Sequence, residues 1–244
     1  MRYSNVIKGT FINRPNRFVA EVLVDGTKTF AHVKNTGRCK ELLVSGATVY
    51  LEDFTSNMGK RKYAYSLIAV EKQLPSDKTL LINMDSQAPN KVIKEAFETN
   101  IITLPNLGKI NYIKPEFVLG SSRLDFFITD TDGNEGYVEV KGVTLENNGI
   151  ASFPDAPTER GIKHINELCN IAKSGKNAYI IFVIQMSGPT VFTPNYERHA
   201  AFAEALRDAE KCGVNILAYD CKVTHNTLDI SHRILINLDA GTFN

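Results

Sequence analysis

The chain has 244 residues, of which 43% are hydrophobic and 23% are charged, and its formal net charge is +1. These values are typical of an ordinary globular protein with one large or two small cores, and they favour no particular chemistry. No apolar run approaches the ~20 residues that a membrane helix needs, and the first residues lack the apolar core of a signal peptide. We therefore expect a soluble, cytoplasmic protein without a membrane partner.

The four cysteines, Cys39, Cys169, Cys212 and Cys221, are scattered along the chain. They include no close pair of the kind that ligates zinc, and they are too sparse for the disulfide framework of a small secreted domain. We expect all four to be reduced thiols.

The first 80 residues carry the basic charge of the chain. They contain 13 Lys and Arg against 7 Asp and Glu, a net of +6, whereas residues 81–244 contain 15 against 20, a net of −5. Turn residues in this first part separate four short segments of strand-like composition, at positions 17–24, 27–33, 47–54 and 63–70. This pattern predicts a small, closed or nearly closed β-barrel.

Cations and aromatic rings in the predicted barrel indicate nucleic-acid binding. Small barrels bind oligonucleotides by placing cations on phosphates and aromatic rings on bases. Phe11, Phe18, Tyr63 and Tyr65 are candidate stackers, although aromatic residues in strands more often fill a core, and the 60–62 basic run could simply solubilise a hairpin tip. The candidate phosphate ligands are Arg14, Arg17, Lys34, Arg38, Lys40, Lys60, Arg61 and Lys62.

A segment containing Pro75 ends the predicted barrel, and a helix from about residue 91 to 100 follows it. Four apolar side chains form a stripe on this helix that predicts packing against the rest of the protein. Glu95 and Glu98 are candidates to approach a metal site from the side. The alternative is that they are solvent-facing carboxylates of an amphipathic helix.

The segment 121–142, SSRLDFFITDTDGNEGYVEVKG, carries the most chemistry. Two apolar-rich segments flank a turn-rich stretch at 130–136, and this arrangement predicts a β-hairpin. Because side chains alternate along a strand, Glu139 and Lys141 share one face, whereas Val138 and Val140 share the other. Asp125 lies on the neighbouring strand of the same hairpin.

Two carboxylates on adjacent strands can hold a hard divalent cation. Asp125 and Glu139, with the Val140 carbonyl, predict a site for Mg²⁺ or Mn²⁺ rather than zinc, which prefers nitrogen and sulfur ligands. Lys141 can then orient the attacking water or stabilise the charge of a phosphoryl transition state. The alternative is a solvated acid-base pair, which hairpins commonly carry on one face.

A second polar segment follows the hairpin. Thr158 is a suitable N-cap for a helix from Glu159 to about Ser174 that Gly175 terminates. Arg160 and His164 are one helical turn apart on one face, so Arg160 can grip a phosphate and His164 can carry a proton or bind a phosphate. A lone helical histidine is, alternatively, a structural or merely exposed residue.

The remaining chain alternates a strand at 177–185, a helix at 193–212 and a strand at 214–220, which predicts a mixed sheet. Arg198 and His199 on the last helix are expected to face solvent.

Five motifs in this order, NTGRCKELL, INMDSQAPNKVIKEA, SRLDFF, GYVEVKGVTL and FPDAPTERGIKHINEL, together resemble the sugar fermentation stimulation protein family, SfsA. The resemblance covers nearly the whole chain. It implies an α+β protein with an OB-fold-like barrel, for which we predict residues 1–82. It also implies an α/β restriction-endonuclease-like domain of the PD-(D/E)XK type with a mixed central sheet, for which we predict residues 83–244.

The resemblance also implies roles for further residues. In nucleases of this type an acidic residue on the first helix often completes the metal shell, and Glu95 is the candidate here. A polar residue on the strand after the catalytic hairpin can lie near the scissile phosphate, and Gln185 matches it.

The family has been described in two ways, which correspond to two functions. One is a metal-dependent nuclease acting on DNA or RNA, and the other is a non-catalytic DNA-binding regulator of sugar (maltose) metabolism. The sequence contains no helix-turn-helix signature for reading bases and no glycine-rich phosphate loop for a nucleotide-dependent enzyme.

Overall fold

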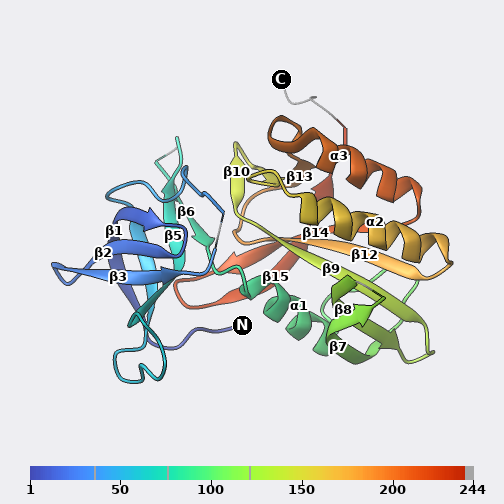
Figure 1. The fold of residues 1–244 in the computed structure, drawn as a ribbon, viewed down its shortest axis with the longest axis horizontal. Coiled ribbons are helices and arrows are strands. Elements are labelled where there is room, and N and C mark those ends of the chain that lie inside the picture. The colour runs from blue at the N-terminus through green and yellow to red at the C-terminus, as the bar shows by residue number, and fades with distance from the viewer. Residues whose placement is uncertain (36, 76, 121, 240–244) are drawn as a thin grey trace.

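The computed structural model describes residues 1–35, 37–75, 77–120 and 122–239. The first third of the chain forms a β-barrel, and the rest forms an α/β domain beside it (Figure 1). Within these ranges, none of the helices is long and apolar enough to cross a membrane.

Five strands close the barrel in the order β3-β2-β1-β4-β5, and a parallel pairing of β3 with β5 completes the ring. A sixth strand, β6, extends the sheet beyond β5. Inward side chains alternate with outward ones, so that Ala31 and Val33 are fully buried on β3 while Phe30 and His32 point outward. The strands are β1 (Val6–Asn16), β2 (Val19–Val24), β3 (Thr27–Val33), β4 (Thr48–Asp53), β5 (Tyr65–Gln73) and β6 (Thr79–Asn83).

A six-stranded mixed sheet in the order β15-β14-β12-β9-β8-β7 forms the centre of the α/β domain. The three central strands β14, β12 and β9 are parallel, and the outer strands run antiparallel to their neighbours. The strands are β7 (Ile110–Leu119), β8 (Ser122–Asp130), β9 (Glu135–Val143), β12 (Asn177–Ile184), β14 (Asn215–Val223) and β15 (Leu228–Arg233).

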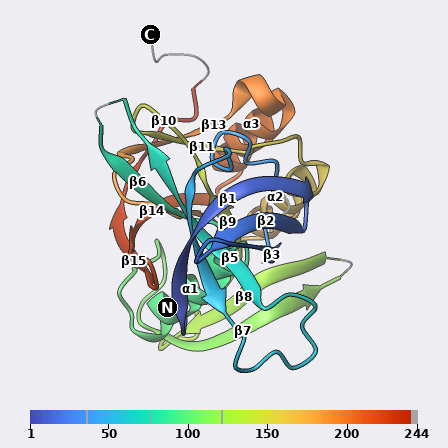
Figure 2. The ribbon, with the colours of Figure 1, turned by 90° about the vertical axis from the view of Figure 1, so that its left-hand side faces the viewer.

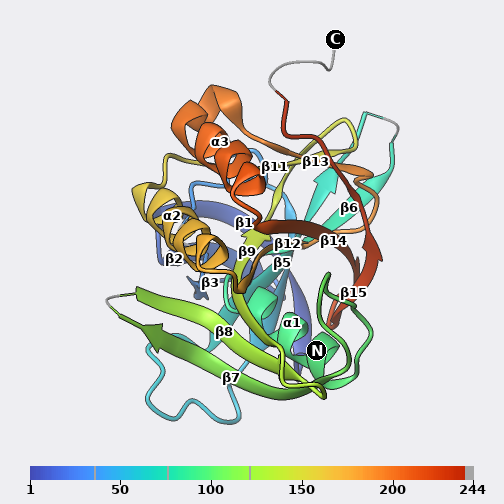
Figure 3. The same cartoon turned by 90° about the vertical axis from the view of Figure 1, so that its right-hand side faces the viewer.

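Helices cover both faces of this sheet (Figure 3). Helix α1 (Ala88–Glu98) buries its apolar stripe against one face, whereas α2 (Glu159–Lys173) and α3 (Tyr196–Lys211) cover the other. A smaller four-stranded sheet lies at the end of the domain and consists of β10 (Leu145–Asn147), β11 (Ile150–Phe153), β13 (Val191–Pro194) and β16 (Leu235–Ile236).

The barrel and the α/β domain are joined by backbone contacts close to the ends of β6 and β12. Ile82 forms a bridge with Met186, and the Asn83 amide donates to the Gln185 carbonyl over 2.8 Å. The N-terminal residues also reach the α/β domain, where Tyr3 donates its amide to the carbonyl of Asn226. Figure 2, which views the molecule from the barrel side, shows β6 leading to this junction.

The predicted fold class is confirmed, with a five-stranded barrel followed by an α/β domain that contains a mixed sheet. The division at residue 82 stays a prediction. Two long strands were not predicted, β1 and β7. β1 alternates only over a short stretch because its pairing with β2 is bulged, and β7 is exposed along most of its length. β7 is a mostly exposed edge strand that contains Pro115, and an edge is one of the few places where a sheet tolerates proline. Residues 191–194 form β13, although the helix was predicted to begin at 193, because they pair with β11.

Candidate functional site

The β8–β9 hairpin places the three predicted catalytic side chains on adjacent strands. Asp125 lies on β8, and Glu139 and Lys141 lie two positions apart on β9. Lys141 Nζ is 2.5 Å from Glu139 Oε1, so the two side chains share a face as the alternation predicts. Val138 and Val140 point to the opposite face, into the core beneath α1.

Glu139 is buried, with 2% of its surface exposed. Its Oε1 accepts from Lys141 and is also paired with His164 Nδ1 on α2. Burial alone would raise the pKa of this carboxyl, but the hydrogen bond from His164 and the charge of Lys141 outweigh burial and lower it. Glu139 Oε2, in contrast, is buried and has no hydrogen-bond partner among the described residues. A buried carboxylate oxygen in this state is costly unless something else occupies it.

His164 and Arg160 extend this network along α2. Thr158 caps the helix as predicted, because its side-chain oxygen accepts the amide of Gly161 over 3.0 Å. Arg160 Nε donates to His164 Nε2 over 3.4 Å, which leaves Nδ1 of a neutral imidazole to carry the proton that faces Glu139. The exposed Arg160 guanidinium therefore lies at the outer end of a chain that leads to Glu139.

Asp125 is held by two donors. The Asn90 side-chain amide donates to Oδ1 over 2.7 Å, and the backbone amide of Val140 donates to Oδ2 over 2.8 Å. Burial raises the pKa of Asp125, and the negative charge of Glu139 raises it further. Each oxygen still has a free lone pair, so the carboxylate can also bind a cation.

Asn90 is a site residue that sequence reasoning missed. It reaches Asp125 because α1 approaches β9 closely at Gly142, where a Cβ atom would lie 2.7 Å from Cγ of Pro89 and 2.5 Å from Oε1 of Gln185. The contact joins residues 35 positions apart. Only the Gly142 in the EVKG string hinted at this close packing.

The donor set fits a hard divalent cation. It offers two carboxylates that disfavour each other electrostatically and one buried oxygen to which no described residue donates. The described ranges contain no group of three or more His, Cys, Asp or Glu side chains that could hold a metal ion by themselves. The remaining ligands would therefore be carbonyls or waters, which suits Mg²⁺ because this ion retains several waters when bound.

Two family models match the chain. The model described as the sugar fermentation stimulation protein RE domain matches residues 87–227, and the SfsA N-terminal OB domain matches residues 12–82. The chain belongs to the SfsA family. Its larger domain is therefore a restriction-endonuclease-like domain, and its barrel is an OB domain.

Individual SfsA proteins match over nearly the full length. The sugar fermentation stimulation protein homolog of Desulfitobacterium hafniense is 45% identical over 241 residues, covering 99% of this chain and all of the relative. The homolog of Clostridium beijerinckii is 50% identical over 231 residues, covering 94% of this chain and 96% of the relative. The structure of Pyrococcus furiosus SfsA in complex with Ca²⁺ has a TM-score of 0.84 and 28% identity, covering 97% of this chain and 98% of that one.

Glu95 is not brought to the carboxylate pair of this SfsA chain. It lies five positions after Asn90, which places it about 140° around α1 from the side chain that contacts Asp125. Its carboxylate lies 2.7 Å from the N-terminal amino group of Met1 and is half exposed. Glu98 pairs with Lys94 on the same helix at 3.0 Å.

Gln185 lies just beyond β12, between the carboxylate pair and the barrel. Its amide donates to Asn83 Oδ1 and to the Asp85 carbonyl, over 2.8 and 3.0 Å, while its Oε1 faces Gly142. Asp85 is completely buried and pairs with Lys34 Nζ at 2.6 Å. Lys34, predicted as a phosphate ligand, therefore joins the SfsA barrel to the segment that precedes α1.

Arg14 is also engaged within the protein. Its guanidinium donates to four backbone carbonyls over 2.6 to 3.0 Å, and burial lowers its pKa. Arg17 is exposed, and its guanidinium carbon lies 4.7 Å from the centre of the Phe18 ring. The other predicted phosphate ligands, also exposed, are Arg38, Lys40, Lys60, Arg61 and Lys62.

We expect Arg14→Ala to lower the free energy of unfolding by about 2 kcal/mol, because four backbone carbonyls lose a charged donor. For a chain of this size, that is a fall in Tm of roughly 4–8 °C, measured by calorimetry. Arg17→Ala is the matched control and should leave Tm unchanged. If Arg17 binds a phosphate, this control variant should also show a shallower salt dependence of nucleic-acid affinity. Equal Tm values for the two variants would contradict the structural role of Arg14.

Among the predicted stackers, Phe11 belongs to the barrel core, whereas Phe18 is 44% exposed. Arg198 is exposed as predicted, although its guanidinium also donates to the Asp155 carbonyl over 2.9 Å. The prediction that His199 faces solvent is wrong, because its side chain is only 12% exposed and its Nδ1 accepts the amide of Thr158. These two residues thus support the loop that begins α2.

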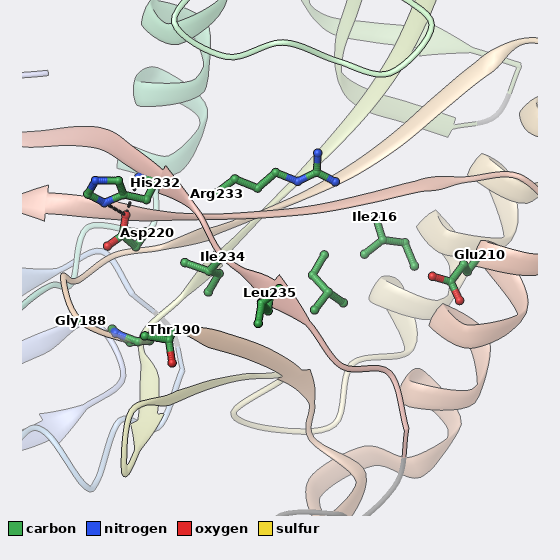
Figure 4. A pocket seen from close by; sticks show the side chains of 11 residues that line it. Gly188, Thr190, Glu210, Ile216, Asp220, His232, Arg233, Ile234 and Leu235 are labelled. Atoms are coloured by element: carbon green, nitrogen blue, oxygen red, sulfur yellow. Dashed lines mark hydrogen bonds and ion pairs between the residues drawn. The ribbon is translucent and has the colours of Figure 1, made fainter.

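A depression of about 910 Å³ lies apart from the carboxylate pair, between β16, α3 and the end of β14 (Figure 4). Its labelled side chains include Ile216, Ile234 and Leu235 on an apolar floor, and Asp220 beside His232 at one end. None of the three predicted catalytic side chains lines it.

Proposed function

We propose that this chain is a divalent-metal-dependent nuclease that hydrolyses phosphodiester bonds in DNA or RNA. The observation that carries the proposal is the buried Oε2 of Glu139, which has no hydrogen-bond partner in the described part of the chain and lies beside Asp125, whose pKa is raised by burial and by the Glu139 charge. The Pyrococcus furiosus SfsA structure supports it, since that protein was solved in complex with Ca²⁺.

Asp125 and Glu139 would hold Mg²⁺ or Mn²⁺. The ion, when bound, supplies a Lewis acid that lowers the pKa of water and screens the charge of the phosphate. Asn90 keeps the Asp125 carboxylate oriented, and the Val140 amide fixes its second oxygen. Together these donors hold one ligand in place before any cation arrives.

Lys141, together with Arg160 and His164 on α2, would act on the substrate phosphate and on the carboxylate beside it. The Lys141 ammonium is mostly buried, at 15% exposure, and lies where it can orient a water molecule or stabilise charge on a phosphate oxygen. His164 holds Glu139 through its Nδ1. Arg160, exposed at the end of this network, can grip a neighbouring phosphate with its planar guanidinium.

The proposal is tested by incubating labelled single- and double-stranded DNA and RNA with the protein in Mg²⁺, Mn²⁺ or EDTA. We expect cleavage of at least one substrate with Mg²⁺ or Mn²⁺ and none in EDTA, read as shortened products on a denaturing gel. Intact substrates under every condition would overturn the proposal, as would cleavage that persists in EDTA. Substrates that are bound but remain intact would favour the non-catalytic DNA-binding regulator instead.

A further inference from the structure

A small hollow lies on the outer face of the barrel, away from the barrel core. It has a volume of about 320 Å³ and is lined by His32, Arg61, Lys62 and Tyr63. Phe30, 46% exposed, adjoins it, because its ring centre lies 6.4 Å from that of Tyr63. We call these five residues the aromatic hollow.

The alternation of side chains along β3 and the pairing of β3 with β5 explain why these side chains face outward. Phe30 and His32 alternate on β3 with Ala31 and Val33, which fill the barrel core. Tyr63 comes from the loop between β4 and β5, and β5 pairs with β3, so the loop returns beside β3. The barrel core is already filled by other residues, so the Phe30 ring is exposed here and the Tyr63 ring is half-buried beside it.

Cations surround these rings. Lys62 Nζ lies 5.4 Å from the centre of the Tyr63 ring. The Arg61 guanidinium stacks 3.5 Å from the centre of the Phe54 ring, which keeps this long side chain in place. Two acidic residues lie near the hollow, and each is paired with a lysine. Glu21, opposite Phe30 on β2, is 3.8 Å from Lys28 Nζ, and Asp85 is 2.6 Å from Lys34 Nζ. The hollow is therefore basic as well as aromatic.

His32 contributes a largely uncharged ring. Burial lowers its pKa, and the positive charges of Lys34 and Arg61 lower it further. A neutral imidazole can stack on a base or form a hydrogen bond with it, whereas the exposed cations of this surface are Arg61 and Lys62.

We infer that the aromatic hollow binds an unpaired nucleobase, so that the substrate of this chain is single-stranded nucleic acid or a single-stranded end or flap. Bases in a duplex are stacked on each other and present only their edges, so exposed rings gain nothing from them. An unpaired base offers its face to Phe30 or Tyr63 while its phosphates meet the two cations. This inference deepens the proposed function, on which it rests for the cleavage step.

The outward row of β3 leads from the aromatic hollow toward the carboxylate pair. Two residues after His32, Lys34 pairs with Asp85, and the Ser86 hydroxyl donates to the Lys34 carbonyl over 2.8 Å. Helix α1 begins two residues further on, at Ala88, and its Asn90 holds Asp125. A strand anchored in the hollow thus lies on the barrel edge that is linked directly to the candidate site.

The test is fluorescence anisotropy in EDTA with a labelled single strand of about 12 nucleotides and with the duplex of the same sequence. We expect tighter binding of the single strand. The double variant Phe30→Ala, Tyr63→Ala should lose about tenfold or more in single-strand affinity, since stacking of each base contributes substantially, while its duplex affinity changes less than about twofold.

Two controls separate stacking from misfolding. Tyr63→Phe keeps the ring and should retain single-strand affinity. Tyr112→Ala removes a ring that is 50% exposed on β7 and should also leave it unchanged. Equal affinities of the wild type for both substrates, or an equal loss of both in the double variant, would overturn the inference.

The result is independent of the cleavage assay. Single-strand preference in EDTA without cleavage in Mn²⁺ would refute the nuclease and retain the aromatic hollow. Cleavage together with equal binding of the single strand and the duplex would retain the nuclease and refute the aromatic hollow.

Discussion

Replacing Asp125 with alanine is expected to abolish metal-dependent cleavage, with a loss of at least about 10³-fold, because one of two carboxylates for the cation disappears. Lys141→Ala should lower the rate about 10²- to 10³-fold, since a positioned charge near the reacting phosphate is lost. Rates are measured under single-turnover conditions in Mn²⁺ on whichever substrate the wild type cleaves. Affinity for nucleic acid, measured in EDTA, should remain largely intact in both variants.

Lys94→Ala provides the matched control for Lys141→Ala. Lys94 is a half-exposed lysine on α1 whose ion-pair partner is Glu98, so its removal should leave cleavage at the wild-type rate. Equal cleavage by the wild type, Asp125→Ala and Lys141→Ala would mean that the activity belongs to another site or to a contaminating nuclease.

The parts of the site that follow from local geometry could be predicted from the sequence. Strand alternation places Glu139 and Lys141 on one face, and their 2.5 Å contact shows this. Helical spacing likewise brings Arg160 within reach of His164. Both placements follow from the period of a single element.

The parts that depend on tertiary approach could not be predicted. The contacts of Asn90 with Asp125 and of His164 with Glu139 join residues 35 and 25 positions apart, so no local spacing rule encodes them. Glu95 was favoured as a ligand by its acidity and by the family resemblance. The structure instead places Glu95 beside the N-terminal amino group, where residues 1–3 cross to the α/β domain.

The net charge of the barrel segment likewise does not show which of its cations are free to bind a ligand. The net of +6 over the first 80 residues predicted a basic surface, but Arg14 and Lys34 are both engaged with the protein itself. Exposed Arg61 and Lys62 beside Tyr63 are better placed to meet a ligand. Burial, which composition does not report, separates the structural cations from the available ones.

Adding Mn²⁺ is expected to stabilise the protein, and the size of this effect should depend on pH. A ligand that binds only the folded state at a hundredfold excess over its Kd contributes about 2.7 kcal/mol, which raises Tm by roughly 5–10 °C for a chain of this size. The cation requires an ionised Asp125, whose pKa is raised. The rise in Tm should therefore be full at pH values above that pKa and be lost as the pH falls through it, at a higher pH than for an ordinary aspartate.

In the metal-free protein, the contribution of Asp125 to stability should depend on pH in the opposite direction. Because the folded state binds this proton more tightly than the unfolded chain, the stability that Asp125 contributes is present at low pH and is lost as the pH rises through its raised pKa. Glu139, whose pKa is lowered, contributes the opposite trend, a stability that is lost as the pH falls through its lowered pKa. Calorimetry in Mn²⁺ and in EDTA across a pH series measures both trends. Glu98→Gln should retain the Mn²⁺ effect and Asp125→Ala should lose it, whereas a Tm rise that survives in Asp125→Ala would place the cation elsewhere.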